Sequence, residues 1–115
     1  NMLQQATRLA RVGGWEVKLQ TGEVLWTAET YGIFDLDPTT PVDLELAKSF
    51  YTPDSLAIIE AAIARTCETG VPYSVETEVR TQKGVVRWIR SMGAPSYADG
   101  ELVGLFGSVQ DITDK

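Results

Sequence analysis

Cys67 is the only cysteine of this chain and histidine is absent, so few side chains could act as nucleophiles, general bases or metal ligands. A cysteine thiol can form covalent adducts or respond to oxidation. Cys67 follows Ile59 and Ile63 at helical spacing, and a cysteine in such a row is usually a small apolar core residue. Without histidine, the chain lacks the usual general base and the commonest ligand of zinc and haem.

Four acidic residues form two pairs that could bind a metal ion or act as an acid–base couple. Asp35 and Asp37 stand beside Pro38, where aspartates commonly form turns. Glu76 and Glu78 share one face of an alternating stretch, which a solvated strand surface explains. No nucleophile, base and orienting group meet at a recognisable spacing. We therefore predict no metal site and no enzymatic activity.

Large aromatic residues are the third group that could carry function. They could line an apolar pocket for a small molecule, or they could simply fill the core. Tyr31 and Phe34 lie in an irregular segment, which makes them the better pocket candidates, whereas the tryptophans on predicted strands could face either side of a sheet. The candidate pocket residues are Trp26, Tyr31, Phe34, Ile63 and Phe106.

The first half of the chain predicts a helix, a hairpin and a string of short helical turns. Residues 1–12 show apolar positions at helical spacing, which indicates an amphipathic helix. The stretch 15–27 alternates on both sides of Thr21-Gly22, as expected of a β-hairpin. Between residues 28 and 50, Pro38 and Pro41 prevent one long helix.

The second half predicts one long helix and three strands. Thr52 and Pro53 form a helix start, with a hydroxyl cap followed by proline at the first position, and Gly70 marks the helix end. After Pro72, alternating stretches are separated by two glycine-bearing turns, which favours an antiparallel meander. The predicted fold class is therefore α+β with one sheet.

Charge and length limit the partners. The chain has 115 residues and a net charge of −6, which suits one domain and opposes binding to nucleic acid or anionic lipid. No apolar run is long enough to cross a membrane. A single cysteine suits a reducing compartment. We expect a cytoplasmic domain with no nucleic-acid partner and no direct membrane insertion.

Five short stretches, in this order, resemble those of PAS domains that carry a C-terminal PAC motif. They are the hairpin GWEVKLQTGEVLW at 14–26, YGIFDLDP at 31–38, the helix start YTPD at 51–54, GVVRWI at 84–89 and DIT at 111–113. Thr52 replaces the histidine common in that helix start. Asp35 stands where glycine is frequent, and aspartate tolerates a left-handed backbone there.

The resemblance covers residues 13–115 and implies a PAS/PAC sensor domain there, preceded by the flanking helix at 1–12. It implies a single five-stranded antiparallel sheet with short helices and one long helix on one face. PAS domains of this kind are sensory input modules of larger signalling proteins. The expected C-terminal effector is a histidine kinase of a two-component system or a diguanylate cyclase. Dimerisation by the flanking segment is frequent in such domains, so we predict a homodimer with its contact at Leu3, Ala6, Leu9 and Ala10.

The resemblance also bears on ligands and on signal coupling. Photosensory PAS domains use a cysteine on a short middle helix and haem-binding ones generally use an axial histidine; both residues are missing here. No cofactor is therefore predicted, while an unknown small-molecule ligand is compatible with the sequence. By resemblance, Asp111, Ile112 and Thr113 form a polar latch near the sheet edge, where the chain leaves toward its effector. An ordinary strand terminus is the alternative interpretation of this motif.

Two broader functions fit the same residues. The first is a sensor whose pocket or dimer interface changes state and biases the effector. The second is a dimerisation or protein-interaction scaffold of PAS type with a filled core and no ligand. A cavity-free core favours the scaffold, and a bound metabolite excludes it.

Overall fold

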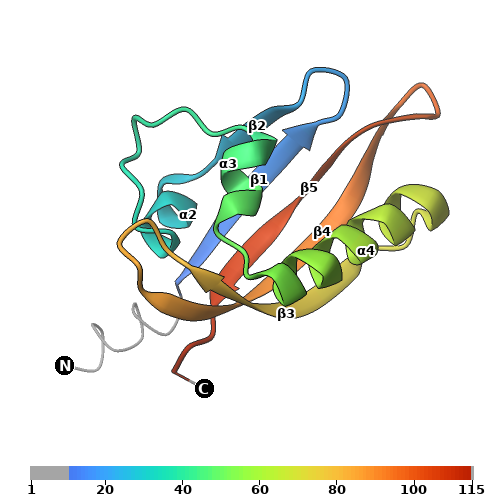
Figure 1. Ribbon diagram of the computed structural model, residues 1–115. Helices are drawn as coiled ribbons and strands as arrows, with labels where there is room; N and C mark the ends of the chain where they lie inside the picture. Colours follow the sequence, from blue (N-terminus) through green and yellow to red (C-terminus); the bar gives the residue numbers. More distant parts are fainter. Residues whose placement is uncertain (1–10, 115) are drawn as a thin grey trace.

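The computed structural model describes residues 11–114 as one antiparallel sheet with its helices on one face (Figure 1). The spatial order of the strands is β2-β1-β5-β4-β3. This arrangement confirms the predicted fold class. The elements are β1 Val12–Lys18, β2 Glu23–Trp26, α2 Ala28–Ile33, α3 Leu44–Ser49, α4 Pro53–Thr69, β3 Tyr73–Arg80, β4 Val86–Ala98 and β5 Glu101–Asp111.

The helix predicted for residues 1–12 lies outside the described residues, apart from its last two positions. Val12 belongs to β1, where it pairs with Gln110 of β5. The proposed contact residues Leu3, Ala6, Leu9 and Ala10 all lie outside the described part. Strand β1 therefore begins beside the end of β5, so both ends of the described chain meet at one end of the sheet (Figure 1).

Local signals fix the helix ends. The Thr52 hydroxyl accepts a hydrogen bond from the Ser55 amide, Pro53 occupies the first turn of α4, and Gly70 ends the helix with a φ of 77°. Glycine adopts a left-handed backbone at this position with the lowest free-energy cost. Between the two hairpins, α2 and α3 are six residues each, as the prolines at 38 and 41 predict.

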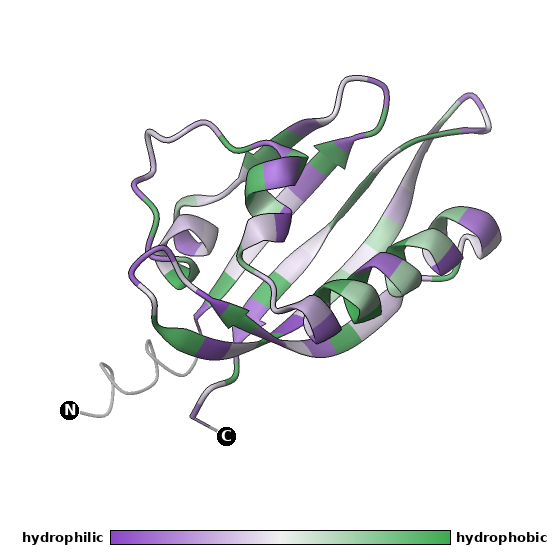
Figure 2. Cartoon of the chain, viewed as in Figure 1, coloured by the Kyte–Doolittle hydropathy of each residue, from purple (hydrophilic) through white to green (hydrophobic). Residues whose placement is uncertain are grey.

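The core lies between the helices and the inner face of the sheet. Strand alternation places Val79, Ile89 and Val109 on this inner face, and all three are buried. Ile33, Phe34 and Phe50 from the helical segment cover them, and together the six form the buried hydrophobic cluster. Figure 2 shows hydrophobic and hydrophilic residues interleaved along α4 and the strands, as expected of elements with one buried face.

The tryptophans do not all face the same side of the sheet. Trp15 and Trp26 pair across β1 and β2 and pack against the core. Trp88 lies on the outer face, with 45% of its surface exposed. Other exposed hydrophobic residues on the outer face are Val12, Leu25, Val86, Met92 and Phe106. Among residues 11–114, no helix is both long and apolar enough to span a membrane.

Candidate functional site

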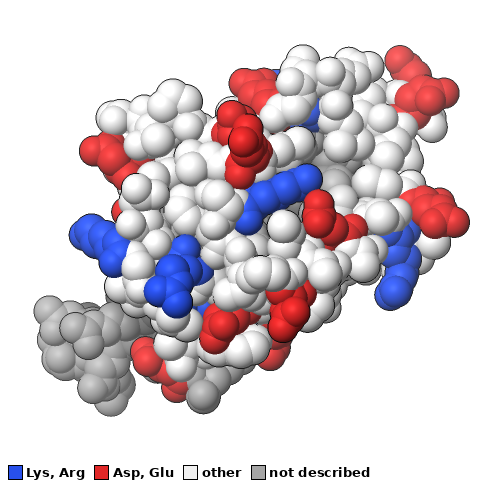
Figure 3. Space-filling model, viewed as in Figure 1, with Lys and Arg blue, Asp and Glu red and all other residues white. Residues whose placement is uncertain are grey.

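A small apolar cavity of about 110 Å³ lies between the sheet and the helices. Its floor is the inner face of the sheet, and α3 and α4 contribute to its walls. The face of the molecule that carries these helices shows charges of both signs without a single-sign patch (Figure 3). The lining residues are Trp15, Val17, Val24, Trp26, Thr30, Phe34, Leu44, Ala47, Lys48, Tyr51, Ile59, Glu60, Ile63, Tyr73, Ser91 and Val109.

Three of the five candidate pocket residues line this cavity: Trp26, Phe34 and Ile63. The Trp26 and Phe34 rings stack, with centroids 4.9 Å apart and planes 20° apart. Such offset stacking adds to the burial free energy of the two rings. Together they form a rigid wall on the side of the cavity that adjoins α2.

The other two candidates were wrongly placed. The Tyr31 ring meets Trp26 edge-on from outside the lining, and its hydroxyl donates to the Thr40 carbonyl at 2.8 Å. Phe106 is 50% exposed on the outer face, because strand alternation turns the neighbouring Leu105 inward. The side chains of Leu105 and Phe106 are both large and apolar, so the sequence pattern alone does not show which of the two is buried.

Two phenols contribute the polar groups of the cavity. Burial raises the pKa of Tyr51 above its ordinary value, and the nearby Tyr73 adds to this rise. Burial likewise raises the pKa of Tyr73, while its hydrogen bond with Ser91 acts in the opposite direction. Both phenols therefore stay neutral at physiological pH. At the cavity's edge, Lys48 of α3 and Glu60 of α4 form an ion pair at 3.3 Å, and both side chains are about half exposed.

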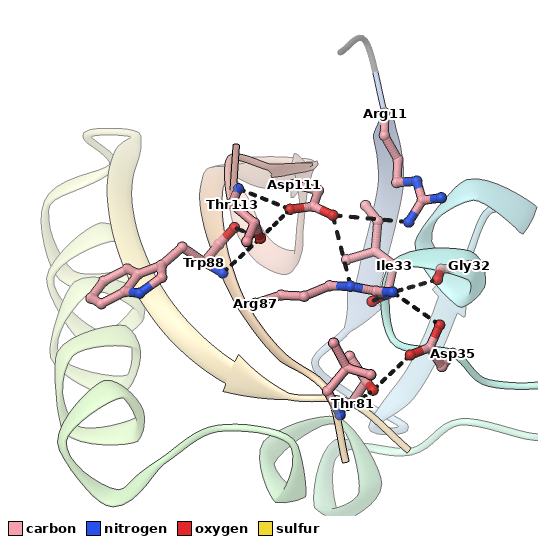
Figure 4. Close-up of polar contacts among 10 residues, drawn as sticks. Arg11, Gly32, Ile33, Asp35, Thr81, Arg87, Trp88, Asp111 and Thr113 are labelled. Atoms are coloured by element: carbon pink, nitrogen blue, oxygen red, sulfur yellow. Dashed lines mark hydrogen bonds and ion pairs between the residues drawn. The ribbon is translucent and has the colours of Figure 1, made fainter. Parts of the chain in front are cut away.

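A network of polar contacts around Arg87 of β4 joins the end of α2 to the end of β5 (Figure 4). Its guanidinium donates to the carbonyls of Gly32 and Ile33 at the end of α2. It also lies 3.3 Å from the Asp35 carboxylate and 3.9 Å from that of Asp111. The side chains of Arg87, Asp35 and Asp111 are only 15–17% exposed. Because arginine can serve several acceptors at once, one side chain ties the helical segment to the end of β5.

Asp111 and Thr113 close the other end of this network. The Asp111 carboxylate accepts hydrogen bonds from the Thr113 amide at 3.0 Å and from its hydroxyl. The Thr113 hydroxyl in turn accepts from the Trp88 amide at 3.1 Å (Figure 4). The Ile112 amide donates to the Trp88 carbonyl at 2.8 Å. Arg11 lies 3.9 Å from the same Asp111 carboxylate. All three residues of the predicted latch therefore contact β4 or one another, at the end of the central strand β5.

Arg87 is the central residue of this network, and sequence reasoning missed it although it stands in the recognised GVVRWI stretch. Asp35 does form a turn, with a left-handed φ of 56°, and it also accepts from Thr81 at 2.7 Å. Asp37 behaves as the turn residue that was predicted: two hydrogen bonds from Thr39 hold the pKa of its carboxyl below the usual range.

The remaining candidates stand apart from the cavity and the network. Cys67 is half-buried near the end of α4, and the fully buried row on that helix runs through Ile59, Ala62 and Thr66 instead. Glu76 pairs with Arg90 at 2.8 Å on the outer face and is about half exposed, as expected of a solvated strand surface.

The antiparallel order β2-β1-β5-β4-β3, with short helices and one long helix on one face, defines a PAS-type α+β domain. The family model for the PAS fold matches residues 23–109. The chain therefore belongs to the PAS fold family.

Its relatives are parts of signalling proteins. The blue-light-activated histidine kinase of Brucella ovis is 26% identical over 116 residues, a match that covers 100% of this chain and 23% of that protein. The chain thus spans about a quarter of the length of the curated relatives it matches. A sensory box histidine kinase/response regulator from Burkholderia thailandensis is 29% identical with a TM-score of 0.78, covering 99% of this chain and 86% of that structure.

A third relative shows the fold alone. The N-terminal domain of a diguanylate cyclase with PAS/PAC sensor from Marinobacter aquaeolei has a TM-score of 0.79 at 18% identity, covering 89% of this chain and 95% of that structure. This PAS domain is therefore homologous to sensor domains of histidine kinases and similar in fold to that of a diguanylate cyclase.

Proposed function

We propose that this domain is a cytoplasmic regulatory input module of a larger signalling protein, in which occupancy of the cavity controls a C-terminal effector. The histidine-kinase relatives support an effector of that kind, and a diguanylate cyclase is the alternative. The domain itself performs no catalysis in this proposal. We also propose that it uses neither haem nor cysteinyl flavin: histidine is absent from the sequence, and Cys67 is not among the residues that line the cavity.

The proposal rests on an unbroken series of contacts that joins the wall of the cavity to the end of β5. Phe34 lines the cavity, and the next residue, Asp35, binds Arg87. Arg87 also holds the carbonyl of Ile33 and faces Asp111. A shift of the Phe34 ring therefore moves backbone and side-chain partners of the same guanidinium that positions Asp111.

Such a network can pass on only the free energy that a ligand supplies. A ligand that binds one arrangement of Phe34 and Asp35 better than another shifts the population between them by its differential affinity. Coupling between sites in other proteins is typically about 1–3 kcal/mol. Loss of one partly buried charge contact is of similar size, so rearrangement of the Arg87 contacts is sufficient for a switch.

A chimeric kinase tests the proposal. This chain replaces the matched PAS domain of the Burkholderia thailandensis sensory box histidine kinase, and autophosphorylation is measured. Ala47→Leu fills the cavity and stands in for a ligand; we expect it to change kinase activity severalfold. Arg87→Gln should remove that difference between the filled and unfilled cavity.

Two comparisons make the result interpretable. Ala57→Leu places the same side chain on an exposed position of α4 and should leave activity unchanged. An active chimera whose autophosphorylation is the same with alanine or leucine at position 47 contradicts the sensor proposal.

The outer face of the sheet favours a second role, assembly of a homodimer. Trp88, Met92 and Phe106 are each 45–50% exposed on the outer face of β4 and β5, and the Arg90–Glu76 ion pair lies on the same face. Exposed aromatic and methionine side chains beside polar groups are typical of an interface. We infer that its occupant is a second copy of the chain. In the sequence, the proposed contact residues Leu3, Ala6, Leu9 and Ala10 immediately precede β1. If the cavity stays empty in the functional state, this scaffold role is the function that remains.

A further inference from the structure

The size of the cavity limits its ligand to a small molecule. Its volume is about 110 Å³, and an apolar protein cavity of roughly 150 Å³ accepts benzene. Trp26 and Phe34 stack on one side, and Ile59 and Ile63 of α4 contribute aliphatic groups. The cavity is smaller than the one that accepts benzene, so a single ring is the largest group that fits between these walls.

The charges at the cavity exclude an ionic ligand. Lys48 and Glu60 are the charged residues of the lining, and they neutralise each other at 3.3 Å. A carboxylate or ammonium group inside would lose its hydration without gaining an unpaired counter-charge, which is strongly unfavourable. The two side chains bridge α3 and α4 and are half exposed.

The polar lining atoms are nearly all engaged already. The Thr30 hydroxyl donates to the Gly14 carbonyl at 2.8 Å, and the hydroxyls of Tyr73 and Ser91 bond each other at 3.4 Å. No hydrogen bond joins the Tyr51 hydroxyl to another residue within 11–114, and the hydroxyl keeps some accessible surface, since Thr77 has the only buried unpaired side-chain oxygen of that range. A tyrosine phenol is neutral at physiological pH even at its ordinary pKa of about 10, so this hydroxyl remains a hydrogen-bond donor there.

We propose that the cavity binds an uncharged molecule built on a single ring, with one oxygen that accepts a hydrogen bond from the Tyr51 hydroxyl. The inference rests on the proposed sensor function and deepens it by naming the ligand's chemistry. The volume of the cavity limits the ligand to one ring, and the Lys48–Glu60 ion pair favours a ligand without charge. The Tyr51 hydroxyl, which can donate a hydrogen bond, determines where the ligand oxygen lies.

Three cyclohexane derivatives, the first two of equal size, separate these requirements. Cyclohexanone has the ring and the acceptor oxygen, methylenecyclohexane has the ring without the oxygen, and cyclohexanecarboxylate adds a charge. Binding is followed by tryptophan fluorescence in a Trp88→Phe background. The two remaining tryptophans, Trp15 and Trp26, both line the cavity, so the emission reports on it directly.

We expect cyclohexanone and methylenecyclohexane to change the emission saturably and cyclohexanecarboxylate to have no effect. Tyr51→Phe should weaken cyclohexanone roughly fivefold, the loss of one neutral hydrogen bond, and leave methylenecyclohexane unchanged. Ala47→Leu should abolish binding of both, with folding verified by near-UV circular dichroism.

Each contrary result has a definite meaning. Binding of the carboxylate as tightly as the ketone overturns the proposed ligand class, as does an equal effect of Tyr51→Phe on both neutral probes or a failure of all three to bind. These outcomes are distinct from failure of the sensor function. If cyclohexanone binds as expected but leaves the chimeric kinase unchanged, the ligand class stands and the sensor proposal fails. If cavity filling alters the kinase and no probe binds, the reverse holds.

Discussion

Asp35 and Asp111 share one guanidinium: Arg87 holds Nη2 3.3 Å from Asp35 Oδ1 and Nε 3.9 Å from Asp111 Oδ2. The two carboxylates belong to the turn after α2 and to the last residue of β5. Without the cation, two partly buried negative charges would face each other across β4. The arrangement therefore makes the position of each carboxylate depend on the other.

Asp35 has both an electrostatic and a backbone role, and two substitutions separate them. Asp35→Asn keeps a residue that tolerates the φ of 56° and removes the charge. We expect it to lower the free energy of unfolding by about 1–2 kcal/mol. Asp35→Ala should cost about 1 kcal/mol more, since alanine is strained in the left-handed region. Urea denaturation measures both values.

Asp99 provides the control for that comparison. It has a φ of 52° at an exposed turn, so Asp99→Ala should show the backbone cost alone, about 1 kcal/mol. Equal stability of the asparagine and alanine variants at position 35 would contradict the backbone argument. An unchanged stability of Asp35→Asn would contradict the electrostatic one.

Thr77 carries a fully buried hydroxyl that lacks a hydrogen-bond partner among the described residues. An unpaired buried hydroxyl costs free energy, so Thr77→Val should raise the free energy of unfolding by up to about 1 kcal/mol. Thr66 is equally buried, but its hydroxyl donates to the Val71 carbonyl at 2.7 Å. Thr66→Val should therefore lower stability by about 1 kcal/mol. Destabilisation by both substitutions would show that the Thr77 hydroxyl is paired.

The buried phenols of Tyr51 and Tyr73 predict a loss of stability at alkaline pH. Their pKa values are raised in the folded state. Below the ordinary tyrosine pKa of about 10, the phenols are neutral in both states and contribute no pH dependence. Above it, the unfolded chain releases protons that the folded chain retains, so the free energy of unfolding falls as pH rises.

Chemical denaturation between about pH 9 and pH 11 tests this prediction, with tyrosinate absorbance recorded on the folded protein. Tyr51→Phe should make the fall in stability shallower. If all four tyrosines of the chain ionise together near their ordinary pKa in the folded protein, the proposed burial of these phenols is incorrect.

The apolar outer face predicts a dimer that depends on Phe106. Phe106→Ser should shift the chain from dimer toward monomer in sedimentation equilibrium, because it removes an exposed aromatic group from the central strand of this face. Ile58→Ser is the matched control, since Ile58 is 48% exposed but lies on α4. A dimer that persists in Phe106→Ser and weakens in Ile58→Ser would place the interface on the opposite face.

Features with local causes could be predicted from the sequence. The turn at Thr21-Gly22, the cap at Thr52 and the helix end at Gly70 each depend on neighbouring residues, and the structure has all three. The long helix and the three final strands follow from their periodicity. The resemblance to PAS domains supplied the expectation that all five strands belong to one antiparallel sheet, and the structure has that sheet.

Features that depend on distant partners could not be predicted. Arg87 looked like one more polar residue on an alternating strand, because its partners on α2 and β5 become neighbours only in the folded sheet. Phe106 was placed in the pocket because β5 has large apolar residues in both alternation phases. The buried row of α4 ends at Thr66 instead of Cys67, a difference of one position that helical spacing does not resolve.

In the proposed mechanism, filling the cavity changes the structure around Asp111 at the end of β5, and Arg87 transmits this change. The direct measurement is amide NMR of the chain with alanine or leucine at position 47, each with Arg87 or with Arg87→Gln. We expect Ala47→Leu to shift the amide signals of Asp111 and Thr113 when Arg87 is present, and not when it is replaced. If the shifts stay confined to the cavity lining in both backgrounds, or reach Thr113 equally without Arg87, the proposed route of coupling is wrong.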